Sequence, residues 1–159
     1  ENLFNILRAY YNEWKFKHPL PNDFRRIAER ISGIQLQWYL TDWTQTTNKI
    51  DYAISDVEDK GEGSKINLTR NQLMPMPLEL LVVLKNGESE LHYIPISLMR
   101  GEKANPYPIK WVVHPDWTWA HLEYSFLIDH PKQEIQTIII DPSGLMADVD
   151  KSNNYYASE

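Results

Sequence analysis

The stretch WYLTDWTQTTNKIDYAI, from Trp38 to Ile54, is where the spacing of apolar residues changes period. At its start, Leu36, Leu40 and Trp43 are separated by four and three residues, which places them on one face of a helix. At its end, apolar and polar residues alternate, as in a half-buried β-strand. The apolar positions of this alternation are Ile50, Tyr52 and Ile54, and the intervening ones are Asp51, Ala53 and Ser55.

Three helices are expected up to this switch. The first covers about residues 2–17 and has one strong apolar face, formed by Leu3, Ile6, Leu7, Tyr10 and Trp14. The second starts at Asn22 as N-cap and is closed by Gly33, and the third covers about residues 35–44. The chain begins inside the first amphipathic pattern without a capping residue, as expected of a segment cut from a longer protein.

Every element expected after Tyr52 is a strand. Asn86-Gly87 is a strong hairpin signal, because both residues tolerate positive φ. About seven strands separated by turn signals predict a β-sandwich after the helices, and hence an α+β chain. Beyond the strand that ends the opening stretch, the expected strands are Lys65–Thr69, Leu78–Leu84, Glu90–Ile94, Ile109–Val113, His121–Ile128 and Glu134–Ile140.

Composition excludes several classes of protein. The 159 residues carry a net charge of −6 without a cluster of Lys or Arg, so we expect no nucleic-acid partner. Cysteine is absent, which excludes disulfides and thiolate metal sites. No apolar run approaches the roughly 20 residues that span a bilayer, and no basic-then-apolar signal pattern opens the chain.

Five histidines are present, and none belongs to an H-E-x-x-H pair. His114, Asp116 and His121 flank an aromatic loop and form a possible metal-binding set, but spacing alone does not provide the geometry that zinc needs. We therefore interpret the histidines, which are His18, His92, His114, His121 and His130, as surface or loop residues.

Signatures of nucleophilic catalysis and of phosphate binding are lacking. Ser143-Gly144 follows Asp141-Pro142 in what we interpret as an ordinary turn and is not part of a G-x-S-x-G elbow. Gly61-Glu62-Gly63 lacks the lysine and the helix of a P-loop. We assign no catalytic residue to this chain.

Three tryptophans, Trp111, Trp117 and Trp119, lie within nine residues. Trp111 is interpreted as a core residue and the two others as loop residues that cover an end of the sandwich. The alternative is a stacking platform for sugar rings or a partner protein. Near the C-terminus, five residues match positions of a calcium loop whose glycine position is held by Asn153; they are Asp148, Asp150, Ser152, Asn154 and Glu159. A solvated polar tail is the expectation, and calcium binding is the alternative.

The order of these elements resembles the C-terminal part of gluzincin zinc aminopeptidases, the aminopeptidase N relatives. The similarity lies in the pattern Leu7–Tyr11, in Asp23-Phe24, in Ser32-Gly33, in a helix with Trp43, and then in Leu73–Val83 and residues 138–154. It implies a tail of a catalytic lobe over residues 1–48 and an immunoglobulin- or fibronectin-like β-sandwich over residues 49–159.

The same resemblance implies a function for the parent protein. The parent is a periplasmic, cell-envelope or secreted enzyme that removes N-terminal residues from peptides with zinc, whereas this chain holds no cofactor. Its partner is the missing catalytic lobe, and the fragment is expected to self-associate through its apolar helix face. Tyr10, Tyr11, Tyr39 and Tyr52 are not assigned the family's catalytic tyrosine. The rival is a stand-alone sandwich that binds protein or carbohydrate through Trp111, Trp117 and Trp119.

Overall fold

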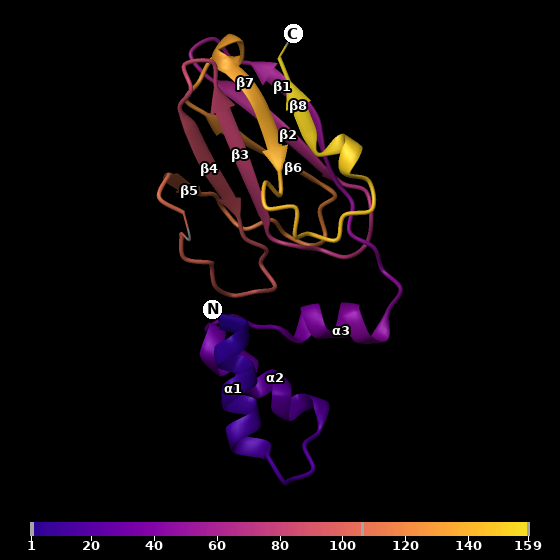
Figure 1. Cartoon of the computed structure of the whole chain (residues 1–159). Coiled ribbons are helices and arrows are strands. Elements are labelled where there is room, and N and C mark those ends of the chain that lie inside the picture. Colours follow the sequence, from indigo (N-terminus) through magenta and orange to yellow (C-terminus); the bar gives the residue numbers. More distant parts are fainter. Residues whose placement is uncertain (1, 106, 159) are drawn as a thin grey trace. The chain divides into compact units, whose positions relative to one another are not determined.

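The computed structural model describes residues 2–105 and 107–158. Within these ranges the chain is a mixed α+β protein with three α-helices and eight strands in two sheets (Figure 1). It divides into a helical unit, Glu1–Thr47 with Leu98–Glu102, and a β unit, Asn48–Ser97 with Lys103–Glu159. The helical unit therefore includes a short segment that follows β4 in the sequence.

The three predicted helices are confirmed as α1 (Asn2–Trp14), α2 (Pro21–Ser32) and α3 (Gln37–Gln45). Gly33 closes α2 with φ 73°, as expected from its lack of a Cβ. The predicted N-cap is wrong, because Leu20 occupies that position and its backbone N–H donates to Asp23 Oδ2 (2.8 Å). Asn22 lies within the first turn, because Pro21 has the φ that suits the first helical position.

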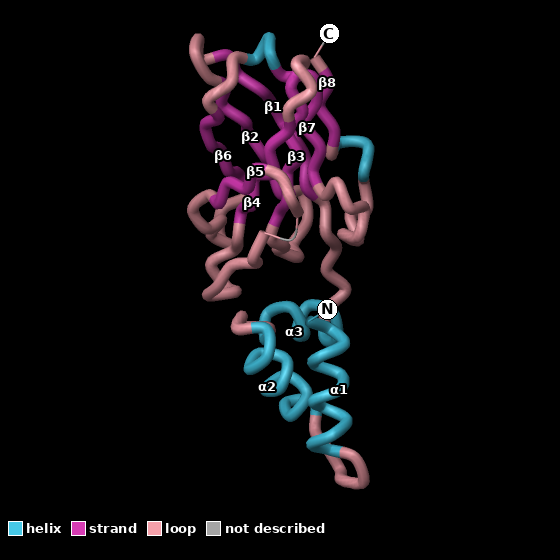
Figure 2. The backbone as a smooth tube through the Cα atoms, turned by 60° about the vertical axis from the view of Figure 1, so that its left-hand side comes forward, coloured by secondary structure: helices cyan, strands magenta, loops and turns pink. Residues whose placement is uncertain are grey.

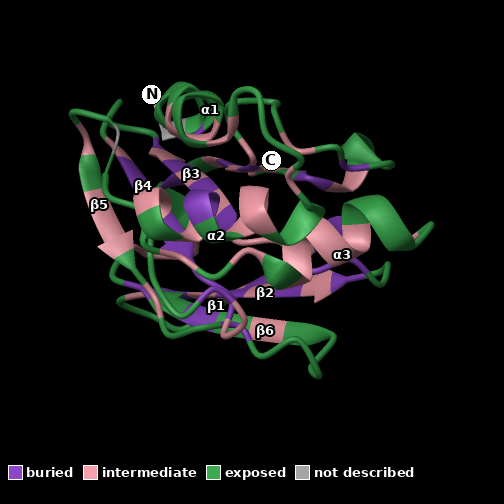
Figure 3. Ribbon diagram, turned by 90° about the horizontal axis from the view of Figure 1, so that it is seen from below, coloured by how far each residue is buried: buried purple, intermediate pink, exposed green. Residues whose placement is uncertain are grey.

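Helices α1 and α2 pack side by side (Figure 2). The Tyr10 ring meets the Phe24 ring edge-on, with centroids 5.3 Å apart, and Ile6 is buried. Ile27 and Ala28 form the buried part of α2 (Figure 3). The segment after β4 adds a buried residue, Met99, whose carbonyl accepts the backbone N–H of Gln35 (2.7 Å).

The β unit consists of a three-stranded and a five-stranded sheet. The first has the order β1-β2-β6, with β1 (Tyr52–Asp59), β2 (Ser64–Arg70) and β6 (Glu123–Ile128). The second has the order β5-β4-β3-β7-β8, with β3 (Leu78–Leu84), β4 (Ser89–Ile94), β5 (Lys110–Val113), β7 (Ile135–Ile140) and β8 (Tyr155–Ala157).

Two features of the five-stranded sheet were not predicted from the sequence. Strand β5 pairs with β4 in parallel, whereas the other strand pairs of the described residues are antiparallel. Strand β8 was not predicted; its three residues pair with β7 and close one edge of the sheet. A three-residue strand provides too little alternation to be detected in a sequence.

The core of the β unit is apolar and receives side chains from both sheets. Every second residue of β3 is buried, and these residues are Leu78, Leu80, Val82 and Leu84. In β2, Ile66 and Leu68 are buried and their neighbours Lys65, Asn67 and Thr69 are half-buried, as the alternation predicts. Contact between the sheets is direct, because Phe126 of β6 lies 5.5 Å from His92 of β4, measured between ring centroids.

The half-buried pattern predicted for the start of the β region is wrong at two positions. Asp51 and Ala53 are buried, as Ile50 and Tyr52 are, with 9% and 8% of their surfaces exposed. The reason for Asp51 is that Asn71 and Asn153 cover it, since the side-chain amides of both donate to its Oδ1. A chain segment a hundred residues away thus buries the face that the sequence pattern assigns to solvent.

Candidate functional site

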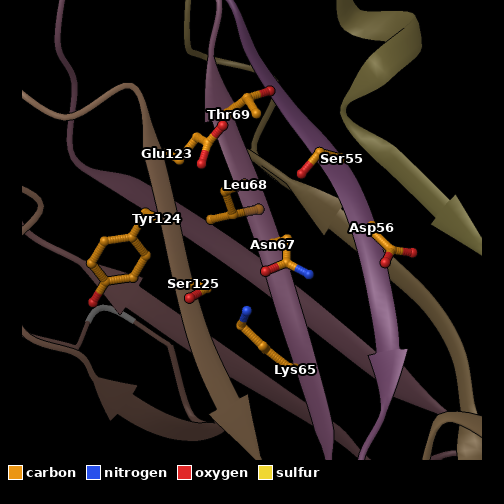
Figure 4. Close-up of a pocket in the computed structure, with 9 residues that line it drawn as sticks. All are labelled: Ser55, Asp56, Lys65, Asn67, Leu68, Thr69, Glu123, Tyr124 and Ser125. Atoms are coloured by element: carbon orange, nitrogen blue, oxygen red, sulfur yellow. The ribbon is translucent and has the colours of Figure 1, made fainter.

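The three-stranded sheet carries a groove of about 530 Å³ on its polar face (Figure 4). We call it the polar groove. It is lined by Ser55, Asp56, Lys65, Asn67, Leu68, Thr69, Glu123, Tyr124 and Ser125. The groove takes side chains from all three strands, and serine, threonine, asparagine, lysine and acidic residues predominate in it.

The local backbone explains why these side chains share a face. Alternate residues of β2 face the core, and the residues between them, Lys65, Asn67 and Thr69, face the groove. In β1 the pairing with β2 shifts register between Ile54 and Asp56. Such a bulge inserts one extra residue, so the strand changes the face to which its later side chains point.

Charge pairing beside the groove is centred on Glu58. Lys60 Nζ donates to its Oε2 (2.7 Å), Asn67 Nδ2 donates to its Oε1 (2.8 Å), and Lys65 Nζ lies 3.6 Å from the same Oε1. The hydrogen bonds from Lys60 and Asn67 lower the pKa of Glu58 to about 2. Glu58 therefore stays ionised in neutral and mildly acidic solution and cannot act as a general acid there.

The groove can bind a polar ligand by hydrogen bonds. Its lining offers hydroxyls, an amide, one lysine and two carboxylates as donors and acceptors.

A second polar group lies between the sheets and is called the histidine cluster. It consists of Glu90 and His92 on β4, His114 after β5, and His130 after β6. Glu90 and His92 are two residues apart in one strand and so share a face, which also carries the buried Ile94. The two other histidines reach this face from loops.

Contacts in the histidine cluster form a continuous chain. His114 Nε2 and His92 Nδ1 are 2.9 Å apart, and His92 Nε2 lies 3.6 Å from Glu90 Oε2. The other carboxylate oxygen of Glu90 accepts from Lys110 Nζ (2.6 Å) and lies 2.9 Å from His130 Nε2. His92 Nε2 is buried without a hydrogen-bond partner at bonding distance.

Burial controls the ionisation of these histidines. Burial, together with the neighbouring His114, lowers the pKa of His92 to about 4, and burial also lowers the pKa of His114. For Glu90, burial acts to raise the pKa, but hydrogen bonds from Lys110 and His130 outweigh it and the pKa is lowered. At neutral pH a charged carboxylate thus lies beside two uncharged imidazoles.

The interpretation of all five histidines as surface or loop residues is wrong for His92, which is 2% exposed in the centre of β4. The proposed set of His114, Asp116 and His121 does not assemble. His114 contacts His92 and Phe126, whereas Asp116 and His121 are exposed. Within residues 2–105 and 107–158, no group of three or more His, Cys, Asp or Glu is arranged to hold a metal ion.

The tryptophans separate into different roles. Trp117 is 3% exposed, stacks on Tyr124 and meets Tyr52 edge-on, with ring centroids 5.2 and 5.4 Å away. Its indole N–H donates to the carbonyl of His121 (2.9 Å). Trp111 stacks on Tyr93, and Trp119 is 56% exposed. Trp117, and not the predicted Trp111, is therefore the buried tryptophan of the three, because Trp111 is only half-buried.

The C-terminal segment is not a solvated tail. Asp148 is buried, and its Oδ2 accepts the backbone N–H of Tyr52 (3.0 Å) while its Oδ1 accepts that of Asp150 (2.9 Å). Asp150 Oδ1 caps a short 3₁₀ turn by accepting from the backbone N–H of Ser152 (3.1 Å). These oxygens serve the backbone and are not grouped around a cation site; Glu159 lies outside the described residues.

The remaining sequence candidates are turns. Ser143 Oγ donates to Asp141 Oδ1 (2.6 Å), and Gly144 has φ 68°. Gly61 has φ 81° in the loop between β1 and β2. Both match the interpretation as turns.

The histidine cluster was not predicted from the sequence. The spacing of Glu90 and His92 placed both on one face of a predicted strand, which was a usable signal. Nothing local indicated that His114 and His130 join them, because their separations along the chain are 22 residues from His92 and 40 from Glu90.

Among the described residues, no helix is long and apolar enough to cross a bilayer. Comparisons of this chain with protein-family models, with curated proteins and with solved structures find no match.

Proposed function

We propose that this chain is the non-catalytic C-terminal portion of a zinc aminopeptidase of the gluzincin kind. In the parent enzyme, a zinc-bound water attacks the first peptide bond of a substrate, and the zinc ligands belong to the catalytic lobe. The helical unit contributes a packing surface to that lobe. The β unit, as an immunoglobulin- or fibronectin-like sandwich, supports it in a periplasmic, cell-envelope or secreted protein.

The observation that carries this proposal is an uncovered apolar face on α1, called the α1 stripe. It consists of Leu3, Phe4, Leu7 and Tyr11, each between 45% and 71% exposed. Of the face predicted from the sequence, only Leu3 and Leu7 belong to it, because Ile6 is buried and Tyr10 packs on Phe24. Their spacing places them within one sector of the helix, next to the Ile6 and Tyr10 side that packs against α2. Burying such side chains stabilises an interface by about 1.5 to 3 kcal/mol each.

Two further features support the proposal. The order of three helices followed by two β-sheets agrees with the order that the resemblance implies. The two sheets share an apolar core, as in a sandwich. The parallel pairing of β4 with β5 is a departure from the all-antiparallel sheets of immunoglobulin domains.

The sharpest test is the coding sequence upstream of this segment. We expect it to encode a helix with H-E-x-x-H and a downstream zinc-binding glutamate. An initiation codon directly before Glu1 would contradict the proposal. Activity adds a second check, since the complete protein should hydrolyse an aminoacyl arylamide with zinc, and this chain alone should not.

Light scattering tests the α1 stripe itself. We expect the isolated chain to self-associate and the double variant Leu3→Ser/Leu7→Ser to be monomeric. The matched control is Leu127→Ser, an equally exposed leucine on β6 whose replacement should leave association unchanged. A strictly monomeric wild-type chain would count against a missing partner.

The alternative, a binding module that uses Trp111, Trp117 and Trp119, has less support. Trp117 offers no free face, because it is enclosed by Tyr52 and Tyr124. Titrating tryptophan fluorescence with glycans separates the two proposals. A saturable emission shift that Trp119→Ala abolishes would favour the binding module.

A further inference from the structure

The loop that joins α1 to α2 is both apolar and basic. It is called the tip and comprises residues 14–20, with the sequence WKFKHPL. Within the helical unit, it lies at the opposite end from α3 (Figures 1 and 2). Phe16 is 99% exposed and Leu20 is 69% exposed, which makes Phe16 the most exposed large apolar side chain among the described residues.

The backbone presents Phe16 outward. Two hydrogen bonds organise the end of α1, from the Lys15 N–H to the Tyr11 carbonyl and from the Lys17 N–H to the Trp14 carbonyl (both 2.9 Å). Phe16 has φ 64°, in the left-handed region that a bulky residue rarely adopts. The turn therefore holds an aromatic ring in solvent in an unfavourable backbone conformation, which local folding preferences do not explain.

Within the tip, the charged side chains have one sign. Lys15 and Lys17 flank Phe16, and no acidic residue lies between Trp14 and Asn22, although the whole chain has a net charge of −6. The Lys17 ammonium lies 5.7 Å from the centre of the Trp14 ring.

The nearest acidic residues in the sequence already have partners. Glu13 pairs with Arg30 (2.7 Å), and Asp23 accepts the backbone N–H of Leu20. Both carboxylates lie at the borders of the tip, and Lys15 and Lys17 are the charged residues within it.

We propose that the tip binds the surface of an anionic lipid bilayer. Phe16 and Leu20 enter the boundary between headgroups and acyl chains, while Lys15 and Lys17 remain at the phosphates, as long basic side chains do at membrane interfaces. The alternation of basic and apolar side chains on a projecting turn favours this partner. A protein pocket that accepted Phe16 would have to accommodate a cation on each side of it.

The proposal is independent of the aminopeptidase proposal, because it concerns a different surface from the α1 stripe and requires no peptidase activity. Its test is co-sedimentation of the whole chain with vesicles of phosphatidylcholine alone and of an equal mixture with phosphatidylglycerol. We expect binding to the mixed vesicles only, weakened by salt.

Two variants and one control make the test specific. Phe16→Ser and Lys15→Glu/Lys17→Glu should each lower binding to the mixed vesicles by about tenfold or more. Leu145→Ser replaces a leucine of the β unit that is 87% exposed and should bind like the wild type. Circular dichroism establishes that each variant is folded.

Absence of wild-type binding to mixed vesicles would overturn the proposal, as would equal binding by the folded tip variants and the wild type. Failure of the aminopeptidase proposal would be recognised separately, in the upstream coding sequence.

Discussion

The imidazole rings of His92 and His114 are nearly parallel, with their centroids 5.1 Å apart, and Nδ1 of His92 lies 2.9 Å from Nε2 of His114. A hydrogen bond at this distance requires one nitrogen to donate and the other to accept, so at least one ring must be neutral. His92 belongs to β4, and His114 follows β5, the strand at one edge of the five-stranded sheet. The hydrogen bond therefore links the segment after this edge strand to the neighbouring strand β4. Protonation of both rings would remove it.

Acid is therefore expected to destabilise the β unit. Burial lowers the pKa of His92 to about 4, below its usual value of 6.5, so the unfolded chain takes up this proton first as the pH falls. The contribution of the neutral imidazole to the free energy of unfolding is fully present above pH 6.5. It decreases as the pH falls towards 4, and the total loss is about 3 kcal/mol. The lowered pKa of Glu90 acts in the same direction. Urea unfolding between pH 7 and pH 4 measures this loss.

Two variants isolate the contribution of His92. His92→Gln removes the titrating group and should flatten the dependence of the unfolding free energy on pH. His121→Gln, at an exposed histidine, should keep the wild-type dependence. Parallel curves for wild type and His92→Gln would show that other groups cause the acid sensitivity. Glu90 and His114, which lie next to His92, and Lys110 and His130, which contact Glu90, remain in both variants.

Replacing Trp117 by alanine should be far more costly than replacing Trp119. The Trp117 ring is buried between Tyr52 and Tyr124 and donates a hydrogen bond, so its loss opens a cavity and should cost about 3 to 5 kcal/mol. Trp119→Ala should change the free energy of unfolding by about 0.5 kcal/mol or less. Urea denaturation of both variants measures the difference, and equal costs would contradict the assignment of Trp117 to the core.

The Asp148 side chain attaches the C-terminal segment to β1. Asp148→Ala would leave the backbone N–H of the buried Tyr52 without its acceptor, and we expect a loss of about 1 to 3 kcal/mol in unfolding free energy. Asp116→Ala, at an exposed aspartate, is the control and should be nearly neutral. If Asp148→Ala is equally neutral, the contact contributes no stability.

Gly63 lies where β2 approaches the end of β6. A Cβ at this position would be 2.7 Å from the backbone carbonyl oxygen of Ile128, which cannot move without disturbing the strand. Gly63→Ala should therefore destabilise the chain by about 1 to 3 kcal/mol, whereas Glu62→Ala should not. Thermal unfolding of both variants checks this. An unchanged midpoint for Gly63→Ala would show that β6 can shift to accommodate the methyl group.

Much of the local structure was predictable because it depends on local spacing. The end of α2 at Gly33 and the hairpin at Asn86-Gly87 follow from backbone preferences of single residues. The faces of β2 follow from strict alternation. Prediction failed for Asp51, because Asn71 and Asn153 cover it, and for Leu20, because the Asp23 carboxylate caps the helix from inside its first turn.

The sequence by itself determined the three helices, most of the strands and the single change from helical to strand period near residue 50, because these depend on contacts within a few residues. Only the tertiary structure decided that β5 runs parallel to β4, that Met99 packs with the helices, and that His114 and His130 join Glu90 and His92. These arrangements depend on contacts between segments that are distant in the sequence, and the spacing of residues along the chain does not specify such contacts.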